Sequence, residues 1–203
     1  MKIEKNLIFS TNIFVSDNVL DQKYIDSMKE DILKSSIEKQ RVNWQSNPNL
    51  HKEKKYEQLT VKVIDMVELV IKDYKWIYEK FEITNMWANI LKPGEMHRPH
   101  THSNNILSGV YYVDTNKDDV ANIQFYDPRP QSSIISPDVT EYTRDNAHIW
   151  MIHSIINRMI IFPSWLQHYV PTNISKTNRI SIAFNIMLKG KVGDSKDLQS
   201  STF

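Results

Sequence analysis

The sequence predicts an α+β chain that is mainly β, with two N-terminal helices followed by an antiparallel sandwich or barrel. Two observations support this fold class. Apolar residues recur every three to four positions between residues 17 and 81, whereas the period is two from residue 83 onward. The short runs after residue 83 have no helical stretches between them, which is typical of antiparallel β proteins. We expect a single domain over 1–203, with a helical part over 17–81, a β core over 83–188 and a polar tail over 189–203.

Two helices are expected in the N-terminal part. The first has Asp17 as its cap and apolar residues at helical spacing: Leu20, Tyr24, Met28, Ile32 and Leu33. The second carries an apolar stripe over roughly six turns, which runs from Leu59 to Phe81. Between them, residues 42–54 form a polar connector with lysines around His51, which we interpret as a solvated surface.

Six strands are expected in the β core, each a short run rich in β-branched and aromatic residues between turn signals. They cover residues 83–91, 106–113, 122–126, 147–152, 158–162 and 179–188. In the last run, alternate residues point to opposite faces. Its even-numbered positions from Ile180 to Leu188 are apolar and suit a hydrophobic layer, whereas Arg179 and Ser181 lie on the other face.

The composition excludes several classes of protein. The formal net charge is +1, which argues against nucleic acid or an anionic membrane as a partner. Cysteine is absent, so disulfides, thiolate metal sites and a cysteine nucleophile are excluded. The four glycines cannot form a glycine-rich phosphate loop. No stretch resembles a signal peptide or a membrane span, so we expect a cytoplasmic protein.

Three of the seven histidines lie close together: His97, His100 and His102. Positions i and i+2 of an extended segment share a face, so His100 and His102 could hold one metal ion, whereas His97 would point away from a regular strand. A third ligand is expected from a later strand, and His168 is the candidate. A His-x-His pattern alone is weak evidence, because a single histidine on a half-buried strand is usually structural.

Arg179 and Ser181 follow this candidate metal ligand on the last predicted strand. A guanidinium is a planar fork that matches a carboxylate, and a neighbouring hydroxyl adds a further donor. The pair therefore predicts a carboxylate-binding site next to a metal. The alternative is an exposed arginine at the start of an edge strand.

Taken in this order, the His-x-His pattern, the distal histidine and the Arg-x-Ser pair resemble the Fe(II)/2-oxoglutarate-dependent oxygenase superfamily. More narrowly, the chain is similar to the oxygenases of bacteria and their viruses that are related to prolyl hydroxylases. The resemblance lies in residues 87–94, 100–102, 107–113, 125–129, 161–168 and 179–185. It implies a double-stranded β-helix (jelly-roll) core, with the two N-terminal helices packed on one sheet.

The resemblance also implies roles for individual residues. His100 and His168 would bind Fe(II), and Arg179 with Ser181 would bind the distal carboxylate of 2-oxoglutarate. Tyr112 matches a tyrosine that contacts this cosubstrate. Other residues are expected to line the pocket: Trp87, Asn89, Tyr126, Asp127 and Trp165.

The implied activity is that of a dioxygenase, a hydroxylase similar to prolyl hydroxylases, which couples decarboxylation of 2-oxoglutarate to oxidation of its substrate. The substrate would be a small molecule, a peptide or a protein. Ascorbate is a further candidate cofactor, and a homodimer is a candidate assembly.

One position departs from the superfamily pattern. His102 stands where these enzymes usually have an aspartate or glutamate that completes two histidines and one carboxylate. Three explanations remain open: His102 ligates the metal itself, which we favour; Asp127 or Asp114 supplies the acid; or water takes the position.

Two rival functions belong to other classes. A cupin-like or zinc-dependent metalloenzyme on the same barrel would also use a His-x-His pattern with a distant histidine. However, the glutamate that a cupin has soon after this pattern is missing here. A non-catalytic jelly-roll binding module is the second rival, and the missing acidic ligand supports it.

Overall fold

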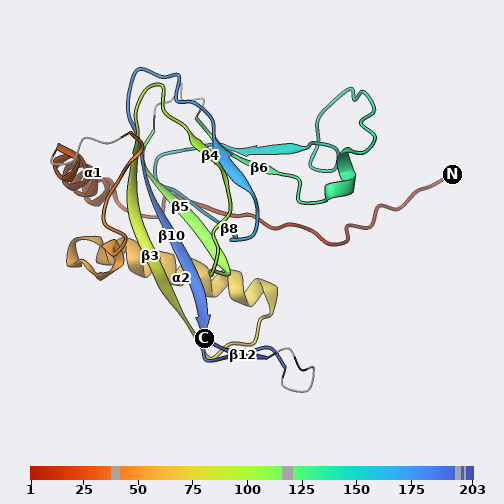
Figure 1. Ribbon diagram of the computed structural model, residues 1–203, viewed down its shortest axis with the longest axis horizontal. Coiled ribbons are helices and arrows are strands. Elements are labelled where there is room, and N and C mark those ends of the chain that lie inside the picture. The colour runs from red at the N-terminus through yellow and green to blue at the C-terminus, as the bar shows by residue number, and fades with distance from the viewer. Residues whose placement is uncertain (38–41, 116–120, 195–197, 199) are drawn as a thin grey trace.

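The computed structural model describes residues 1–37, 42–115, 121–194, 198 and 200–203. Within these residues, the core of the chain consists of two antiparallel sheets with two α-helices beside them (Figure 1). The six-stranded sheet has the order β1 (Phe14–Asp17), β8 (Arg158–Pro163), β5 (Leu107–Asp114), β10 (Arg179–Lys189), β3 (Lys80–Leu91) and β2 (Trp44–Gln45). The four-stranded sheet has the order β4 (His97–His100), β9 (His168–Val170), β6 (Ile123–Tyr126) and β7 (Ile149–Ile152).

The eight strands from β3 to β10 form a jelly roll. The strands β3, β5, β8 and β10 belong to the large sheet, and β4, β6, β7 and β9 belong to the small one, so the chain passes repeatedly from one sheet to the other. All six predicted strands are present, and the mainly β, antiparallel fold class is confirmed. The short strands β4 and β9 were not predicted as strands, because they are only three to four residues long and show too little alternation to be recognised.

Helix α1 (Gln22–Ile37) begins later than expected. The carboxylate of Asp21 accepts a hydrogen bond from the backbone N–H of Tyr24 at 2.9 Å, so Asp21 caps the helix. Asp17 was the wrong choice of cap. It lies in β1, where its carboxylate pairs with the guanidinium of Arg158.

Helix α2 (Glu57–Tyr74) ends earlier than the apolar stripe suggested. Lys75 adopts a left-handed backbone conformation with φ of 56°, which stops the helix. Ile77 is therefore 98% exposed and Phe81 lies in β3, so neither residue extends the helical stripe. Neither helix in the described part of the chain has the length and apolarity that crossing a bilayer requires.

Two buried layers result from the alternation of side chains in the large sheet. The even-numbered residues of β10 share one core with the buried faces of α1 and α2, represented by Ile32 and Val67. The opposite face of the large sheet packs toward the small sheet, where Tyr112 and Phe125 belong to a second cluster. Because Arg179 and Ser181 occupy odd-numbered positions of β10, they lie on this second face.

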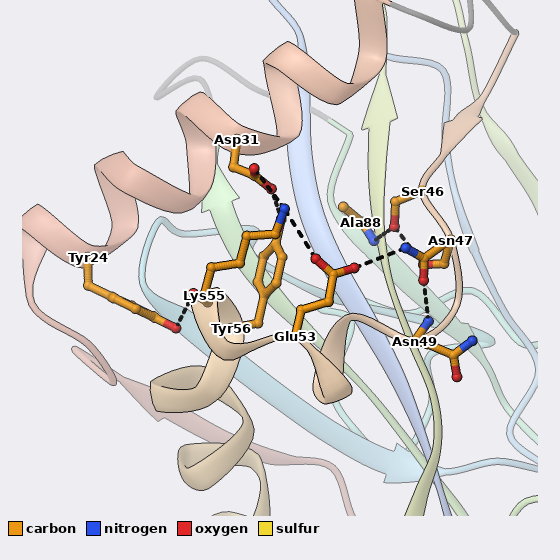
Figure 2. Close-up of polar contacts among 9 residues, drawn as sticks. All are labelled: Tyr24, Asp31, Ser46, Asn47, Asn49, Glu53, Lys55, Tyr56 and Ala88. Carbon is orange, nitrogen blue, oxygen red and sulfur yellow. Dashed lines mark hydrogen bonds and ion pairs between the residues drawn. The ribbon is translucent and has the colours of Figure 1, made fainter.

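The connector between the helices is held to both α1 and β3 (Figure 2). It contains two short 3-10 helices, η1 (Leu50–Lys52) and η2 (Lys54–Tyr56). Asp31 of α1 accepts hydrogen bonds from Lys55 Nζ at 2.8 Å and from Tyr56 Oη at 2.7 Å. At the other end, the backbone N–H of Ser46 donates to the carbonyl of Ala88 at 3.0 Å. The connector is therefore a fixed part of the fold.

The tail contains a short antiparallel pair, β11 (Lys191–Val192) with β12 (Ser201–Thr202). Residues 195–197 and 199 of the predicted tail lie outside the described residues.

Candidate metal and cosubstrate site

Two histidines from neighbouring strands and a third from the segment that follows β4 converge between the sheets. His100 ends β4 and is the direct partner of His168, the first residue of β9, while His102 follows two residues later. One ring nitrogen from each residue lies within 4.8 Å of the other two. The Nε2 atoms of His102 and His168 are 3.3 Å apart. The structure thus brings together the three residues that the sequence singled out as metal ligands.

Backbone carbonyls orient two of these imidazoles. His100 Nδ1 lies 2.7 Å from the carbonyl oxygen of Arg98, and His168 Nδ1 lies 2.9 Å from that of Leu166. A carbonyl can only accept, so Nδ1 carries the proton in both rings. Nε2 is then left with a free lone pair, which is the arrangement found in metal-binding histidines.

Burial favours the neutral form of two of these imidazoles, those of His102 and His168. Desolvation, with a smaller contribution from the charge of His100, lowers the pKa of His102 to about 4. Desolvation also lowers the pKa of His168 to about 3, although its hydrogen bond to Leu166 opposes the shift. Neutral imidazoles are the form that binds a metal ion, so His102 and His168 need to lose no proton at neutral pH.

The two aspartates proposed as a replacement for the missing acid are engaged elsewhere. Asp127 receives two hydrogen bonds from the guanidinium of Arg129, at 3.0 and 2.8 Å, and this pairing lowers its pKa to about 2. Asp114 pairs with Lys29 Nζ at 2.7 Å. Within the described residues, the cluster that could hold a metal contains histidines alone.

A cavity of about 390 Å³ adjoins the histidines and is lined by strands of both sheets. Trp87 and Asn89 line it, as expected. Tyr126 and Asp127 are not among its lining residues, because Tyr126 sits on the outer face of β6 with its ring against Tyr169, 5.3 Å between centres. Trp165 is also outside the cavity and is 58% exposed.

Arg179 is buried at the edge of this cavity. It is only 3% exposed, and its guanidinium donates hydrogen bonds to Ser181 Oγ at 3.5 Å and to Ser154 Oγ at 3.3 Å. The guanidinium carbon lies 4.9 Å from the centre of the Tyr112 ring. Ser154 was missed by sequence reasoning, because it lies in a loop between β7 and β8 without a motif around it.

His97 also lines the cavity, contrary to the expectation for a regular strand. The pairing of β4 with β9 shifts register between His97 and His100, so the alternation of side chains is broken there. His97 Nε2 and Tyr112 Oη are buried without a hydrogen-bond partner among the described residues. Burial, followed by the charge of Arg179, lowers the pKa of His97 to about 4.

Comparisons with known proteins agree with this geometry. The model of a family described as "Putative 2OG-Fe(II) oxygenase" matches residues 85–185, about half of the chain. No curated protein matches the sequence.

Several solved structures share the fold. A prolyl-4-hydroxylase from Pseudomonas putida has a TM-score of 0.63 and 12% identity, with 89% of this chain and 90% of that chain covered. The viral collagen prolyl hydroxylase of Paramecium Bursaria Chlorella virus-1, solved with 2-oxoglutarate, has a TM-score of 0.56 and 13% identity, with 86% and 94% covered. HygX from Streptomyces hygroscopicus, with nickel and 2-oxoglutarate bound, has a TM-score of 0.63 and 8% identity, with 95% and 91% covered.

Proposed function

Because this chain belongs to the 2OG-Fe(II) oxygenase family, we propose that it is a hydroxylase that uses Fe(II) and 2-oxoglutarate. One observation carries the proposal. Three imidazoles with converging ring nitrogens lie in the same cavity as a buried arginine that bonds to two hydroxyls. A 2-oxo diacid that binds a metal through one end needs a neighbouring site for the carboxylate at its other end, and this cavity offers both.

The residues present fit a divalent metal. In this proposal His100, His102 and His168 hold the ion through Nε2, which leaves the remaining positions of its coordination sphere for cosubstrate and oxygen. Three neutral ligands contribute no negative charge, but 2-oxoglutarate is itself a dianion and offsets the charge of the ion. The bound iron would supply the oxidative chemistry that couples 2-oxoglutarate decarboxylation to substrate oxidation.

The protein's further contribution, besides the metal site, is to bind and orient the cosubstrate. Arg179 and Ser181 would hold the distal carboxylate, as the fixed guanidinium fork is complementary to two carboxylate oxygens. The orphaned hydroxyl of Tyr112, beside Arg179, supports this role, since a bound carboxylate would satisfy a buried donor that has no partner among the described residues. His97 offers a second unsatisfied nitrogen in the same neighbourhood.

For the substrate, we propose a peptide or protein side chain rather than a free metabolite. The likeness to two prolyl hydroxylases supports this preference, although HygX shares the fold to the same degree. Ascorbate would serve as an accessory reductant, and homodimerisation is part of the same proposal.

The test is an anaerobic titration of the metal-free protein with Fe(II) and then with 2-oxoglutarate. The chelate of both on the protein should give a weak visible charge-transfer band, and admission of oxygen should release succinate. Tight zinc binding that 2-oxoglutarate does not alter would favour the zinc enzyme instead, because a set of three histidines also suits zinc. A correctly folded protein that gives no band would indicate a binding module.

A further inference from the structure

The side-chain amide of Asn89 is held in a single orientation on the wall of the cavity. Its Oδ1 accepts hydrogen bonds from Trp87 Nε1 at 3.1 Å and from Gln45 Nε2 at 3.0 Å. An indole N–H can only donate, so the amide atom that faces Trp87 must be the oxygen. The NH2 group of Asn89 is therefore turned away from Trp87 and from Gln45.

In the part of the chain that the structure describes, this NH2 group has no acceptor. Asn89 is 4% exposed and lines the cavity, and among the described residues no oxygen accepts a hydrogen bond from its Nδ2. Because Asn89 lines the cavity, its NH2 group is open to whatever the cavity holds and is free to donate a hydrogen bond there. A ligand oxygen in the cavity would be a suitable acceptor for it.

The position of Asn89 in the sheet points to the ligand. Asn89 of β3 is the direct partner of Ser181 in β10, and Ser181 is in turn paired with Tyr112 of β5. Directly opposite residues of neighbouring strands project to the same face. Asn89 therefore extends, by one strand, the row of residues proposed to hold 2-oxoglutarate.

The second restraint on the amide comes from the connector between the helices. Gln45 belongs to β2, which pairs with the edge of β3. Figure 2 shows why this segment is fixed: Ser46 Oγ accepts a hydrogen bond from the Ala88 N–H at 2.9 Å, and Asn47 Nδ2 donates to Glu53 at 3.0 Å. Gln45 is thus presented to Asn89 by a segment held at both ends.

We propose that Asn89 donates a hydrogen bond to 2-oxoglutarate, and that Gln45 and Trp87 are positioning residues that hold its NH2 group toward the cavity. This inference rests on the proposed function, since it needs 2-oxoglutarate in the cavity. It adds an amide donor to that site and gives the connector a role in the affinity for the cosubstrate.

The main variant is Asn89→Asp, which keeps an oxygen for Trp87 and Gln45 but replaces the NH2 group by a second acceptor. Asn85→Asp is the matched control, because Asn85 lies on the same strand and does not line the cavity. The dissociation constant of 2-oxoglutarate is measured by anaerobic calorimetry with Mn(II) bound, together with the metal content. We expect Asn89→Asp to weaken binding about tenfold or more and Asn85→Asp to leave it unchanged.

Gln45→Ala tests the positioning role on an exposed residue, whose loss the fold should tolerate. It should weaken 2-oxoglutarate binding about two- to threefold in the wild type and have no further effect in an Asn89→Ala background. Equal effects of Gln45→Ala in both backgrounds would overturn the positioning role.

The two proposals can fail separately. If the wild type and Asn85→Asp both fail to bind 2-oxoglutarate, the proposed function itself is wrong. If both bind it and Asn89→Asp binds it equally well, only the role of Asn89 is overturned.

Discussion

The imidazole rings of His100 and His168 lie 4.4 Å apart, centre to centre, although 67 residues lie between them in the sequence. They meet because the two residues are direct partners in the pairing of β4 with β9. A metal site built on two paired strands is positioned by the hydrogen bonds of the sheet, so the ligands need little reorganisation to bind an ion.

His168→Ala should empty this site. Its ring is one of the three proposed ligands, and without it only two imidazoles remain to hold the ion. We expect the bound Fe(II) or Mn(II), measured by elemental analysis after dialysis, to fall at least about tenfold relative to wild type. His153→Ala is the control, because His153 is exposed and lies outside the cluster, and it should retain its metal.

His102→Asp should yield a working metal site, because it restores the carboxylate that related enzymes have at this position. The matched control is His102→Asn, which has the same shape without the negative charge. Affinity for Fe(II) should be about tenfold or more higher in the aspartate variant than in the asparagine variant. Equal affinities in a titration of the two variants would show that residue 102 is not a ligand.

The convergence of the three histidines was the most predictable feature of the candidate site. The spacing of His100 and His102 put them on one face of an extended segment, and His168 was the candidate for a third ligand from a later strand. Likewise, the alternation of β10 placed Arg179 and Ser181 on the face opposite to Ile180.

Other features could not be read from the sequence, because they depend on pairing between distant strands. The place of His97 follows from a register shift in β4, and that shift exists only in the pairing with β9. Ser154 and Gln45 reach the site through loop and connector contacts that no spacing encodes. Tyr126 was misplaced because periodicity shows which residues share a face but not which face is inside.

Arg179→Gln should weaken 2-oxoglutarate binding and leave metal binding nearly intact, since Arg179 contacts hydroxyls and an aromatic ring rather than the histidine cluster. Loss of a charge-assisted pair to a carboxylate should raise the dissociation constant about tenfold to a hundredfold. Arg129→Gln, which removes an arginine outside the cavity, should change neither quantity. If calorimetry shows that metal and cosubstrate are lost together in Arg179→Gln, the strand is structural.

Gly109→Ala should destabilise the fold, because Gly109 lies in β5 between two neighbouring strands. A Cβ atom there would lie 2.2 Å from the ring of Phe184 and 2.7 Å from the carbonyl oxygen of Ile160. The ring can move, but the carbonyl belongs to the adjacent strand β8 and cannot. We expect the free energy of unfolding in urea to fall by about 1–3 kcal/mol. Phe184→Leu should restore only part of that loss, and full restoration would contradict the role of the backbone contact.

The metal-free protein should lose stability as the pH falls from about 7 to 5. Burial lowers the pKa values of His97 and His102 to about 4 and that of His168 to about 3, whereas the unfolded chain has ordinary histidines with a pKa of 6.5. Between these values the unfolded state binds protons that the folded state does not, so acidification favours unfolding. The stabilisation is fully present above pH 6.5 and is lost progressively below it.

Urea denaturation at pH 7.5, 6 and 5 measures this slope. The ion pairs of Asp17 and Asp127 do not contribute in this window, because both aspartates have pKa values lowered below 3.8 and stay charged there. Replacing His168 by Gln should reduce the slope, since glutamine has no proton to gain. A free energy of unfolding that stays constant from pH 7.5 to 5 would show that these histidines are not held neutral by burial, and the preorganised, proton-free metal site would have to be abandoned.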